Sequence, residues 1–209
     1  MIQKSVFDGY GLYTLRSDAL EVSVAELGAT VTKLRFGGRT LTLGYGTAAE
    51  YLAGRAYLGA IVGRYANRIG GGAFRINGQR FELTKNEGSN TLHGADMFNA
   101  RCWQGEIDGD TLRLTLVSPD GDEGFPGELG VSVLYTLTKE NSLEIRYEAV
   151  SSKDTVINLT NHIYFNLNGN DTVKGHRLWI DADSITKTND ELIPTGEFLA
   201  VKGTKFDFT

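Results

Sequence analysis

The dipeptide Asn77-Gly78 lies between two short runs, AFRI and QRFEL, in which apolar and polar residues alternate. Alternation with period 2 is typical of a β-strand that buries one face, and Asn-Gly suits the positive φ angles of a two-residue hairpin turn. The dipeptide Gly37-Gly38 repeats this arrangement between VTKLRF and RTLTLG. Both patterns predict antiparallel hairpins in the first half of the chain.

Alternating runs continue through the middle of the chain, in residues 112–116, 131–137 and 143–149. The last two runs flank the turn Glu140-Asn141-Ser142, so we expect them to pair. Twenty-six glycines against three prolines suit many tight turns. No strand–helix–strand spacing indicates a parallel sheet. The sequence therefore predicts an all-β fold, a large antiparallel β-sandwich.

We expect residues 1–209 to form a single domain, because no linker, internal repeat or low-complexity tract divides them. Two stretches, residues 46–60 and 95–109, alternate less regularly. They are expected to be loops or short helical turns. No long helix is predicted.

Charge and cysteine content restrict the partners and the compartment. The net charge is −5 at pH 7, and the sequence has no basic stripe, so we expect neither a nucleic-acid partner nor an anionic membrane surface. No apolar run approaches membrane-spanning length. Cys102 is the only cysteine, and the first residues carry no apolar signal core, which indicates a reducing cytoplasm. The expected partner is a small molecule or another protein.

The stretch NLTNHIYFNLNG (158–169) resembles a strand with one apolar and one polar face. Its apolar row is interrupted only by Asn161, and its polar row carries His162 among carboxamides and hydroxyls. Such a face suits the wall of a cleft for a polar ligand. An ordinary solvated strand face is the alternative.

Further candidate residues lie in GRYANRI (63–69) and NEGSNTLHG (86–94). Arg64 and Arg68 point to the same side if the first stretch is extended, and a guanidinium suits sugar hydroxyls or a carboxylate. A structural salt bridge is the alternative for each arginine. His93 follows a polar turn, whereas His176 lacks asparagine-rich surroundings and is expected to be structural.

Several classes of chemistry have no support in the sequence. There is no HxH, HExxH or CxxC spacing for a metal, and no GxSxG elbow, P-loop or dinucleotide fingerprint. We expect no cofactor. Acid–base chemistry remains, for which imidazole, with an unperturbed pKa of about 6.5, is well placed.

The motifs GRYANRI, FELTKNEGSNTLHG, VINLTNHIYFNLNG and DELIPTGEFLAVKGTKFDF together resemble successive signatures of the aldose 1-epimerase, or galactose mutarotase, family. The resemblance begins near the N-terminus, with AELGATVTKLRF, and continues to the last residue. It implies a β-sandwich isomerase that interconverts the α and β anomers of a free aldose, such as galactose or glucose, without a cofactor.

The resemblance also implies roles for four residues. In that chemistry a carboxylate removes the proton from the anomeric hydroxyl while an imidazolium protonates the ring oxygen. By its place in TNHIYFN, His162 resembles the general acid, and by its place in NTLHG, His93 resembles the histidine that holds the ring and hydroxyls. Arg68 resembles the sugar-binding arginine, with Asn67 as its neighbour.

The family pattern continues beyond the segment that GTKFDF resembles, and that further portion carries a sugar-binding aspartate and the glutamate that acts as base. We therefore expect the general base beyond residue 209, and assign it neither to Glu87 nor to Glu191. The chain is expected to be a truncated copy or to be completed by a second polypeptide. Unfinished sheets would also favour self-association.

Two other functions stay open. A hexose-phosphate 1-epimerase on the same fold would need a cationic pocket, to which Arg64 and Arg68 would contribute. A non-catalytic sugar-binding module would keep the cleft without the base. The motifs resemble the free-aldose branch most closely, and the sequence does not identify the preferred sugar.

Overall fold

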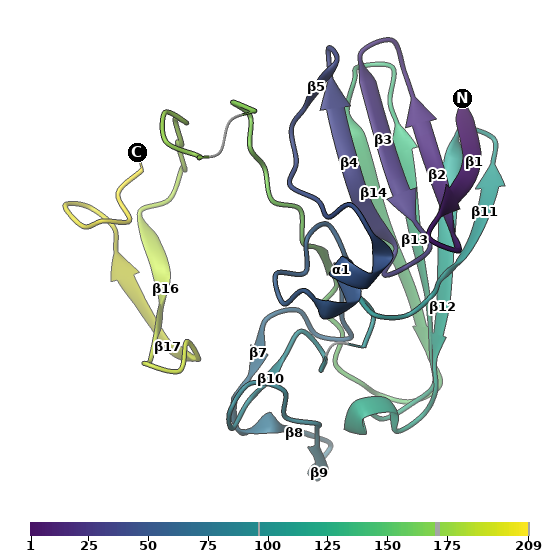
Figure 1. The fold of residues 1–209 in the computed structure, drawn as a ribbon. Coiled ribbons are helices and arrows are strands. Elements are labelled where there is room, and N and C mark those ends of the chain that lie inside the picture. Colours follow the sequence, from purple (N-terminus) through teal and green to yellow (C-terminus); the bar gives the residue numbers. More distant parts are fainter. Residues whose placement is uncertain (96, 170–171, 209) are drawn as a thin grey trace.

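A computed structural model describes residues 1–95, 97–169 and 172–208. The chain begins with a five-stranded antiparallel sheet in sequence order, because each connection is a tight turn between neighbouring strands (Figure 1). Its strands are β1 (Ile2–Phe7), β2 (Tyr10–Arg16), β3 (Leu20–Ala25), β4 (Thr30–Phe36) and β5 (Arg39–Thr40).

A second antiparallel sheet has four strands, again in sequence order: β11 (Gln104–Asp108), β12 (Thr111–Ser118), β13 (Leu129–Leu137) and β14 (Leu143–Ser151). The predicted pairing of the last two alternating runs is confirmed, with Leu137 opposite Leu143 across the turn. Both glycine-containing hairpins are also confirmed. Asn77 and Gly78 adopt φ values of 50° and 80° between β8 (Ala73–Ile76) and β9 (Gln79–Glu82).

The two large sheets pack face to face because the alternating residues of each supply one apolar face. Val22 and Val24 of β3 and Val131 and Val133 of β13 lie in the same buried core. The phenol of Tyr135 crosses the core and donates to the backbone carbonyl of Ala29 at 2.6 Å. The predicted all-β antiparallel sandwich is confirmed, whereas the assignment of residues 1–209 to a single domain stays a prediction.

The remaining elements are short. Two-residue strands form the pairs β6 (Ile61–Val62) with β15 (Thr160–Asn161) and β7 (Arg68–Ile69) with β10 (Thr91–Leu92). A capping box between Thr47 and Glu50 starts the six-residue helix α1 (Ala48–Ala53). Two 3₁₀ turns are η1 (Gly70–Gly72) and η2 (Asp122–Gly124).

The expectation for residues 46–60, a loop with a short helical turn, agrees with α1. The expectation for residues 95–109 is wrong in part, because Gln104–Asp108 forms the edge strand β11. Its alternation is weak since an edge strand is solvated on one side, and its residues are mostly exposed. No helix among the described residues is long and apolar enough to cross a membrane.

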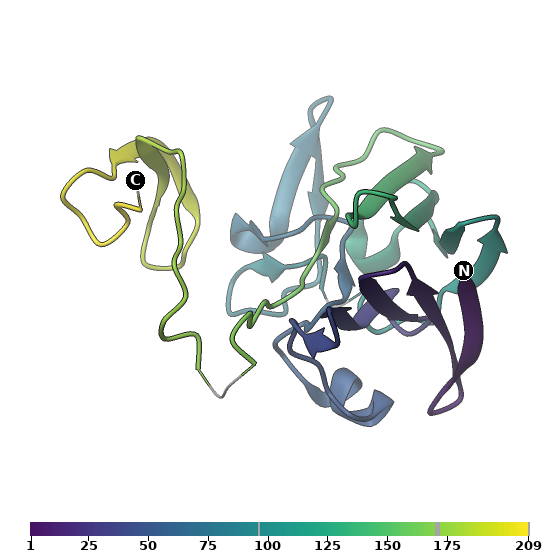
Figure 2. The same cartoon turned by 90° about the horizontal axis from the view of Figure 1, so that it is seen from above.

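The last hairpin, β16 (Ser184–Thr188) and β17 (Pro194–Ala200), lies apart from the sandwich in both views (Figures 1 and 2). Every residue of β17 is exposed. The turn of this hairpin nevertheless contacts the body, because Glu191 accepts a hydrogen bond from the Ser89 hydroxyl at 3.1 Å. This contact brings the hairpin turn to the loops that carry the candidate site.

Candidate functional site

His162 lies on an extended segment that is fixed by backbone hydrogen bonds to the loop after α1. Its carbonyl accepts from the N–H of Gly59, and its own N–H donates to the carbonyl of Ala60, each at 2.9 Å. Two residues earlier, β15 pairs with β6. The backbone on either side of the His162 ring is therefore held in place.

The prediction of one long strand with a buried apolar face is wrong in part. Only Thr160–Asn161 is regular strand, because the segment pairs in turn with residues 41–43, 59–62 and 64–66 instead of with one long neighbour. The predicted apolar face is also largely uncovered. Phe165 is 53% exposed and Leu167 49%, whereas the predicted polar-face residue Asn166 is buried.

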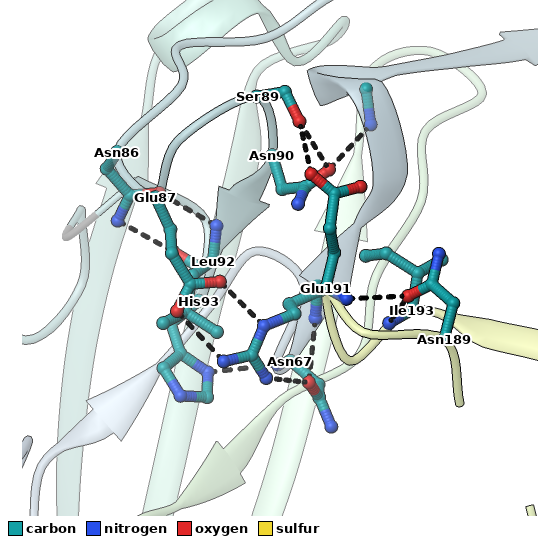
Figure 3. Close-up of polar contacts among 12 residues, drawn as sticks. Asn67, Asn86, Glu87, Ser89, Asn90, Leu92, His93, Asn189, Glu191 and Ile193 are labelled. Atoms are coloured by element: carbon teal, nitrogen blue, oxygen red, sulfur yellow. Dashed lines mark hydrogen bonds and ion pairs between the residues drawn. The ribbon is translucent and has the colours of Figure 1, made fainter. Parts of the chain in front are cut away.

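His93 follows β10 and is bound to Asn67 by two reciprocal contacts (Figure 3). The N–H of Asn67 donates to Nδ1 of His93 at 2.9 Å, and the N–H of His93 donates to the carbonyl of Asn67 at 3.1 Å. A nitrogen that accepts a hydrogen bond carries no proton. The proton of the neutral imidazole therefore belongs to Nε2, which makes His93 a hydrogen-bond donor through that atom.

Three residues of this site have a strained backbone conformation. Asn67, His93 and Tyr57 have φ values of 70°, 53° and 55°, in the left-handed region that residues with side chains rarely adopt. Such conformations persist where surrounding contacts fix them, and they are concentrated at functional sites. Here a side-chain carboxamide helps, since Asn86 bonds both the N–H and the carbonyl of Leu92 beside His93 (Figure 3).

Two glycines allow the three polar motifs to meet. A Cβ atom on Gly94 would lie 2.1 Å from the carbonyl oxygen of Gly63, so the loop after His93 packs backbone against backbone on the GRYANRI stretch. A Cβ atom on Gly63 would lie 2.5 Å from the side chain of Leu159. Side chains at either position would separate the segments that carry Asn67, His93 and His162.

The two imidazoles lie together in a cluster of four rings. The centroids of His93 and His162 are 5.1 Å apart, with an edge-to-face angle of 85°. Tyr57 packs against His93 at 4.7 Å and against His162 at 5.7 Å, and Tyr164 stacks on His162 at 5.1 Å. Aromatic contacts restrict the orientation of both histidines.

The two histidines border an open cleft of about 520 Å³. Six of its nine lining residues carry a carboxamide, a hydroxyl or an imidazole, and three are apolar. The lining residues are Ala66, Asn67, His93, Asn158, Leu159, Thr160, Asn161, His162 and Ile163. These groups donate and accept hydrogen bonds, as a polyhydroxyl ligand requires. Within the described ranges, no cluster of three or more metal-ligating side chains occurs.

Arg68 is the residue directly after Asn67, which lines this cleft. Its Nε and Nη2 donate to the two carboxylate oxygens of Glu87 at 2.6 and 2.8 Å, and its Nη1 donates to the side-chain oxygen of Asn67 at 3.3 Å. The guanidinium is thus oriented on two sides. The structure brings three predicted residues, Asn67, His93 and His162, into the lining of one cleft. Arg68 contacts that lining through Asn67.

Arg64 does not share this position, which corrects the expectation that both arginines face one way. Its side chain is fully buried and donates to Ser118 and to the carbonyls of Pro119 and Pro126, at 2.9 to 3.1 Å. The GRYANRI stretch is not a continuous strand, so alternation does not apply to it. Arg64 therefore has structural contacts, but they are hydrogen bonds to carbonyls and a hydroxyl and not the salt bridge that the alternative specified.

Sequence reasoning missed Tyr57 and the contact of Glu87 with Arg68. Tyr57 lies in the stretch predicted as irregular, and no local pattern identifies a ring that reaches two histidines of distant motifs. Glu87 gave a weak signal, as a carboxylate in the same short polar turn as His93. His176 lies in the C-terminal part, between the segment of His162 and β16, and the expectation that it is structural stays a prediction.

Comparisons with known proteins agree on one family. A family model described as aldose 1-epimerase matches residues 11–209. The chain is 41% identical over 203 residues to a galactose mutarotase of Sus scrofa, covering 93% of this chain and 59% of that protein. It is 39% identical over 208 residues to an aldose 1-epimerase of Escherichia coli, covering 95% and 60%.

Solved structures show the same fold. The chain is similar to an aldose epimerase homologue from C. elegans, with a TM-score of 0.89 and 32% identity over 95% of this chain and 64% of that one. A galactose 1-epimerase from Lactobacillus acidophilus gives a TM-score of 0.85, also at 32% identity, over 100% and 64%. The chain spans about three fifths of the length of the curated relatives it matches.

Proposed function

Because the chain belongs to the aldose 1-epimerase family, we propose that it takes part in interconverting the α and β anomers of a free aldose such as galactose or glucose. The observation that supports this most directly is the pair of imidazoles, 5.1 Å apart, beside a cleft lined with carboxamides and hydroxyls. The proposed reaction opens the sugar ring to the aldehyde and closes it on the other face of C1. It uses acid–base groups alone.

We assign His162 as the general acid that protonates the ring oxygen. Its ring is bounded by Tyr57, His93 and Tyr164, and among the described residues no hydrogen bond holds its nitrogens. It is therefore available to exchange a proton with a ligand. His93, with Nδ1 occupied by the peptide N–H of Asn67, suits the role of a donor that orients the sugar.

Arg68 and Asn67 are proposed to bind sugar hydroxyls. A guanidinium has five N–H donors, of which three are engaged by Glu87 and Asn67. The remaining two are available for a ligand at the edge of the cleft. Asn67 lines the cleft and supports both His93 and Arg68.

The general base stays unassigned among residues 1–209. Glu87 and Glu191, two carboxylates of the quoted motifs, each already have a partner. Glu87 forms an ion pair with Arg68, and Glu191 accepts a hydrogen bond from Ser89. The proposal therefore expects the base from the portion of the family domain that this chain does not span. A polypeptide that carries that portion would complement the chain, and the protein is proposed to act in the cytoplasm.

The hexose-phosphate alternative has less support. Arg64 is buried and its donors are bound within the protein, so it is not available to a phosphate. The charge of Arg68 is balanced by Glu87. A non-catalytic sugar-binding module stays the second candidate, favoured by the cleft itself together with the unassigned base.

Polarimetry on freshly dissolved α-D-galactose and α-D-glucose tests this proposal. We expect little activity above buffer from the 209-residue chain alone. Mixing it with a polypeptide that carries the remaining part of a relative should restore anomer exchange, and this mixture is called the complemented chain below. As a control, His162→Asn in the complemented chain should be inactive.

The outcomes separate the candidate functions. Robust activity from the chain alone would show that a carboxylate within it is the base. Sugar binding without exchange in either preparation would favour the binding module. Exchange of a sugar phosphate in preference to the free aldose would favour the hexose-phosphate enzyme, and failure to bind any of these sugars would overturn the proposal.

A further inference from the structure

Arg68 and Glu87 form a bidentate ion pair that is partly buried. Both carboxylate oxygens are engaged, at 2.6 and 2.8 Å, by Nε and Nη2 of one guanidinium. The Arg68 side chain is only 18% exposed and that of Glu87 38%. Bidentate pairs of this kind fix orientation as well as charge, and partial burial reduces screening by water.

The pair lies next to the residues that are proposed to hold the sugar. Arg68 follows Asn67 in sequence and is opposite Leu92 in the β7–β10 register, and Leu92 precedes His93. Glu87 belongs to a turn closed by reciprocal backbone hydrogen bonds with Asn90. Figure 3 shows Glu87, Asn67 and His93 within one cluster of polar contacts. The cation and its counter-charge therefore lie beside Asn67 and His93, which line the cleft.

We propose that Glu87 is a specificity-determining residue. Its negative charge neutralises that of Arg68, so the cleft binds uncharged sugars in preference to anionic ones. This inference rests on the proposed function and deepens it. An unpaired guanidinium would attract a carboxylate or phosphate on the ligand, whereas a paired one presents only hydrogen-bond donors beside a negative charge. Discrimination by such repulsion adds to discrimination by favourable contacts.

The arginine nearest to Arg68 in the sequence does not supply a replacement cation. Arg64 is buried, and its guanidinium donates to Ser118 and to the carbonyls of Pro119 and Pro126. The other carboxylate nearby, Glu191, accepts a hydrogen bond from Ser89. Glu191 therefore offers a matched control, because removing its charge leaves the Arg68 pair unchanged.

The test compares binding of D-glucose and D-glucuronate, which differ in the charge of one substituent. Titrations of the 209-residue chain, followed by NMR of the His93 and His162 ring signals, give both dissociation constants. Glu87→Gln should shift the ratio about fivefold to tenfold toward glucuronate, as expected for one unmasked charge at the edge of the site. Glu191→Gln should shift it by less than about twofold, because its charge is more exposed and more screened.

Two further variants keep the test decisive if Glu87→Gln fails to fold. Glu87→Asp keeps the charge and should keep the wild-type ratio. Arg68→Gln leaves the carboxylate unbalanced and should shift the ratio away from glucuronate. Equal shifts for Glu87→Gln and Glu191→Gln, or no shift with Glu87→Gln and Arg68→Gln, would overturn the inference while leaving the proposed function standing. If wild type bound neither galactose nor glucose nor a sugar phosphate, both this inference and the proposed function would be overturned.

Discussion

The peptide N–H of Asn67 donates to Nδ1 of His93, and the peptide N–H of His93 donates back to the carbonyl of Asn67. Each residue therefore fixes the other, although 26 positions separate them in the sequence. The contact distinguishes the two imidazoles of the cleft. His93 is committed to one tautomer, whereas among the described residues no hydrogen bond fixes the tautomer of His162.

This relationship predicts that neutral His93 carries its proton on Nε2. Nitrogen-15 chemical shifts of the ring should show Nδ1 as an acceptor and Nε2 as protonated. His93→Asn should lower turnover of the complemented chain, with part of the loss in KM because the proposed role is orientation. Protonated Nδ1 in the free chain would contradict the hydrogen bond, and unchanged kinetic constants would return His93 to a structural role.

His162→Asn should abolish most turnover of the complemented chain while the fold stays intact. The loss of a positioned general acid costs about a hundredfold to ten-thousandfold in rate. Polarimetry gives the rate, and the dispersion of the NMR spectrum checks the fold. Turnover at the wild-type level in the folded variant would refute the assignment.

Tyr57 should orient both histidines through its ring. Tyr57→Leu removes the contacts at 4.7 and 5.7 Å, which are worth about 0.5–1.5 kcal/mol each in typical aromatic pairs. We expect a severalfold loss of turnover and altered ring signals of His93 and His162. Tyr57→Phe keeps the ring and separates its contribution from that of the hydroxyl. Equal losses for both substitutions would point to the hydroxyl instead of the ring.

The two arginines should respond differently to substitution by lysine. Arg68→Lys loses the planar fork that holds Glu87, so it should lower kcat/KM with little change in the pH profile. Arg64→Lys leaves buried carbonyls and the Ser118 hydroxyl without donors, so it should cost about 2–4 kcal/mol in the free energy of unfolding. Urea denaturation and polarimetry separate the two effects. A stable Arg64→Lys variant with weakened sugar binding would contradict this division.

Asp122 should stabilise the fold in a pH-dependent manner. Burial raises the pKa of its carboxyl, but hydrogen bonds from Arg101 and Ser118 outweigh it and hold that pKa below its usual range. The ionised form is therefore favoured in the folded state, and its contribution is present above the ordinary pKa of 3.8 and lost as the pH falls through the lowered value.

Asp122→Asn should accordingly reduce the free energy of unfolding at pH 7 by about 1–3 kcal/mol. The difference from wild type should shrink as the pH falls below about 4, where the wild-type carboxylate itself becomes protonated. Urea denaturation at several pH values measures it, with the exposed Asp18→Asn as a control. If Asp122→Asn became more destabilising as the pH fell, the predicted lowering of the Asp122 pKa in the folded state would be wrong.

Local chemistry made the sandwich predictable. Hairpins at Gly37-Gly38 and Asn77-Gly78, and the pairing around Asn141, follow from turn residues and period 2, which act over a few residues. The edge strand β11 was missed because solvent on one side weakens its alternation. The exposure of Phe165 was also unforeseen, since a pattern of apolar residues does not state what covers them.

The candidate site was predictable only as a set of residues. Sequence motifs identified His93, His162, Asn67 and Arg68 one stretch at a time. Their arrangement depends on contacts between segments far apart in the chain, such as the reach of Tyr57 to both imidazoles. Arg64 is instead buried against Ser118, because the GRYANRI stretch is not a continuous strand and period-2 alternation does not apply to it.

The close approach of Gly94 to Gly63 limits how this cleft can be altered by engineering. The carbonyl of Gly63 occupies the space that a side chain at position 94 would need. A single substitution at either glycine would therefore push the histidine and arginine segments apart. Variation in ligand preference is therefore easier to introduce through side chains on the rim than through the loop backbones. A library directed at Glu87 and its neighbours would sample new preferences on an unchanged frame, whereas one directed at the glycines would mostly sample misfolded chains.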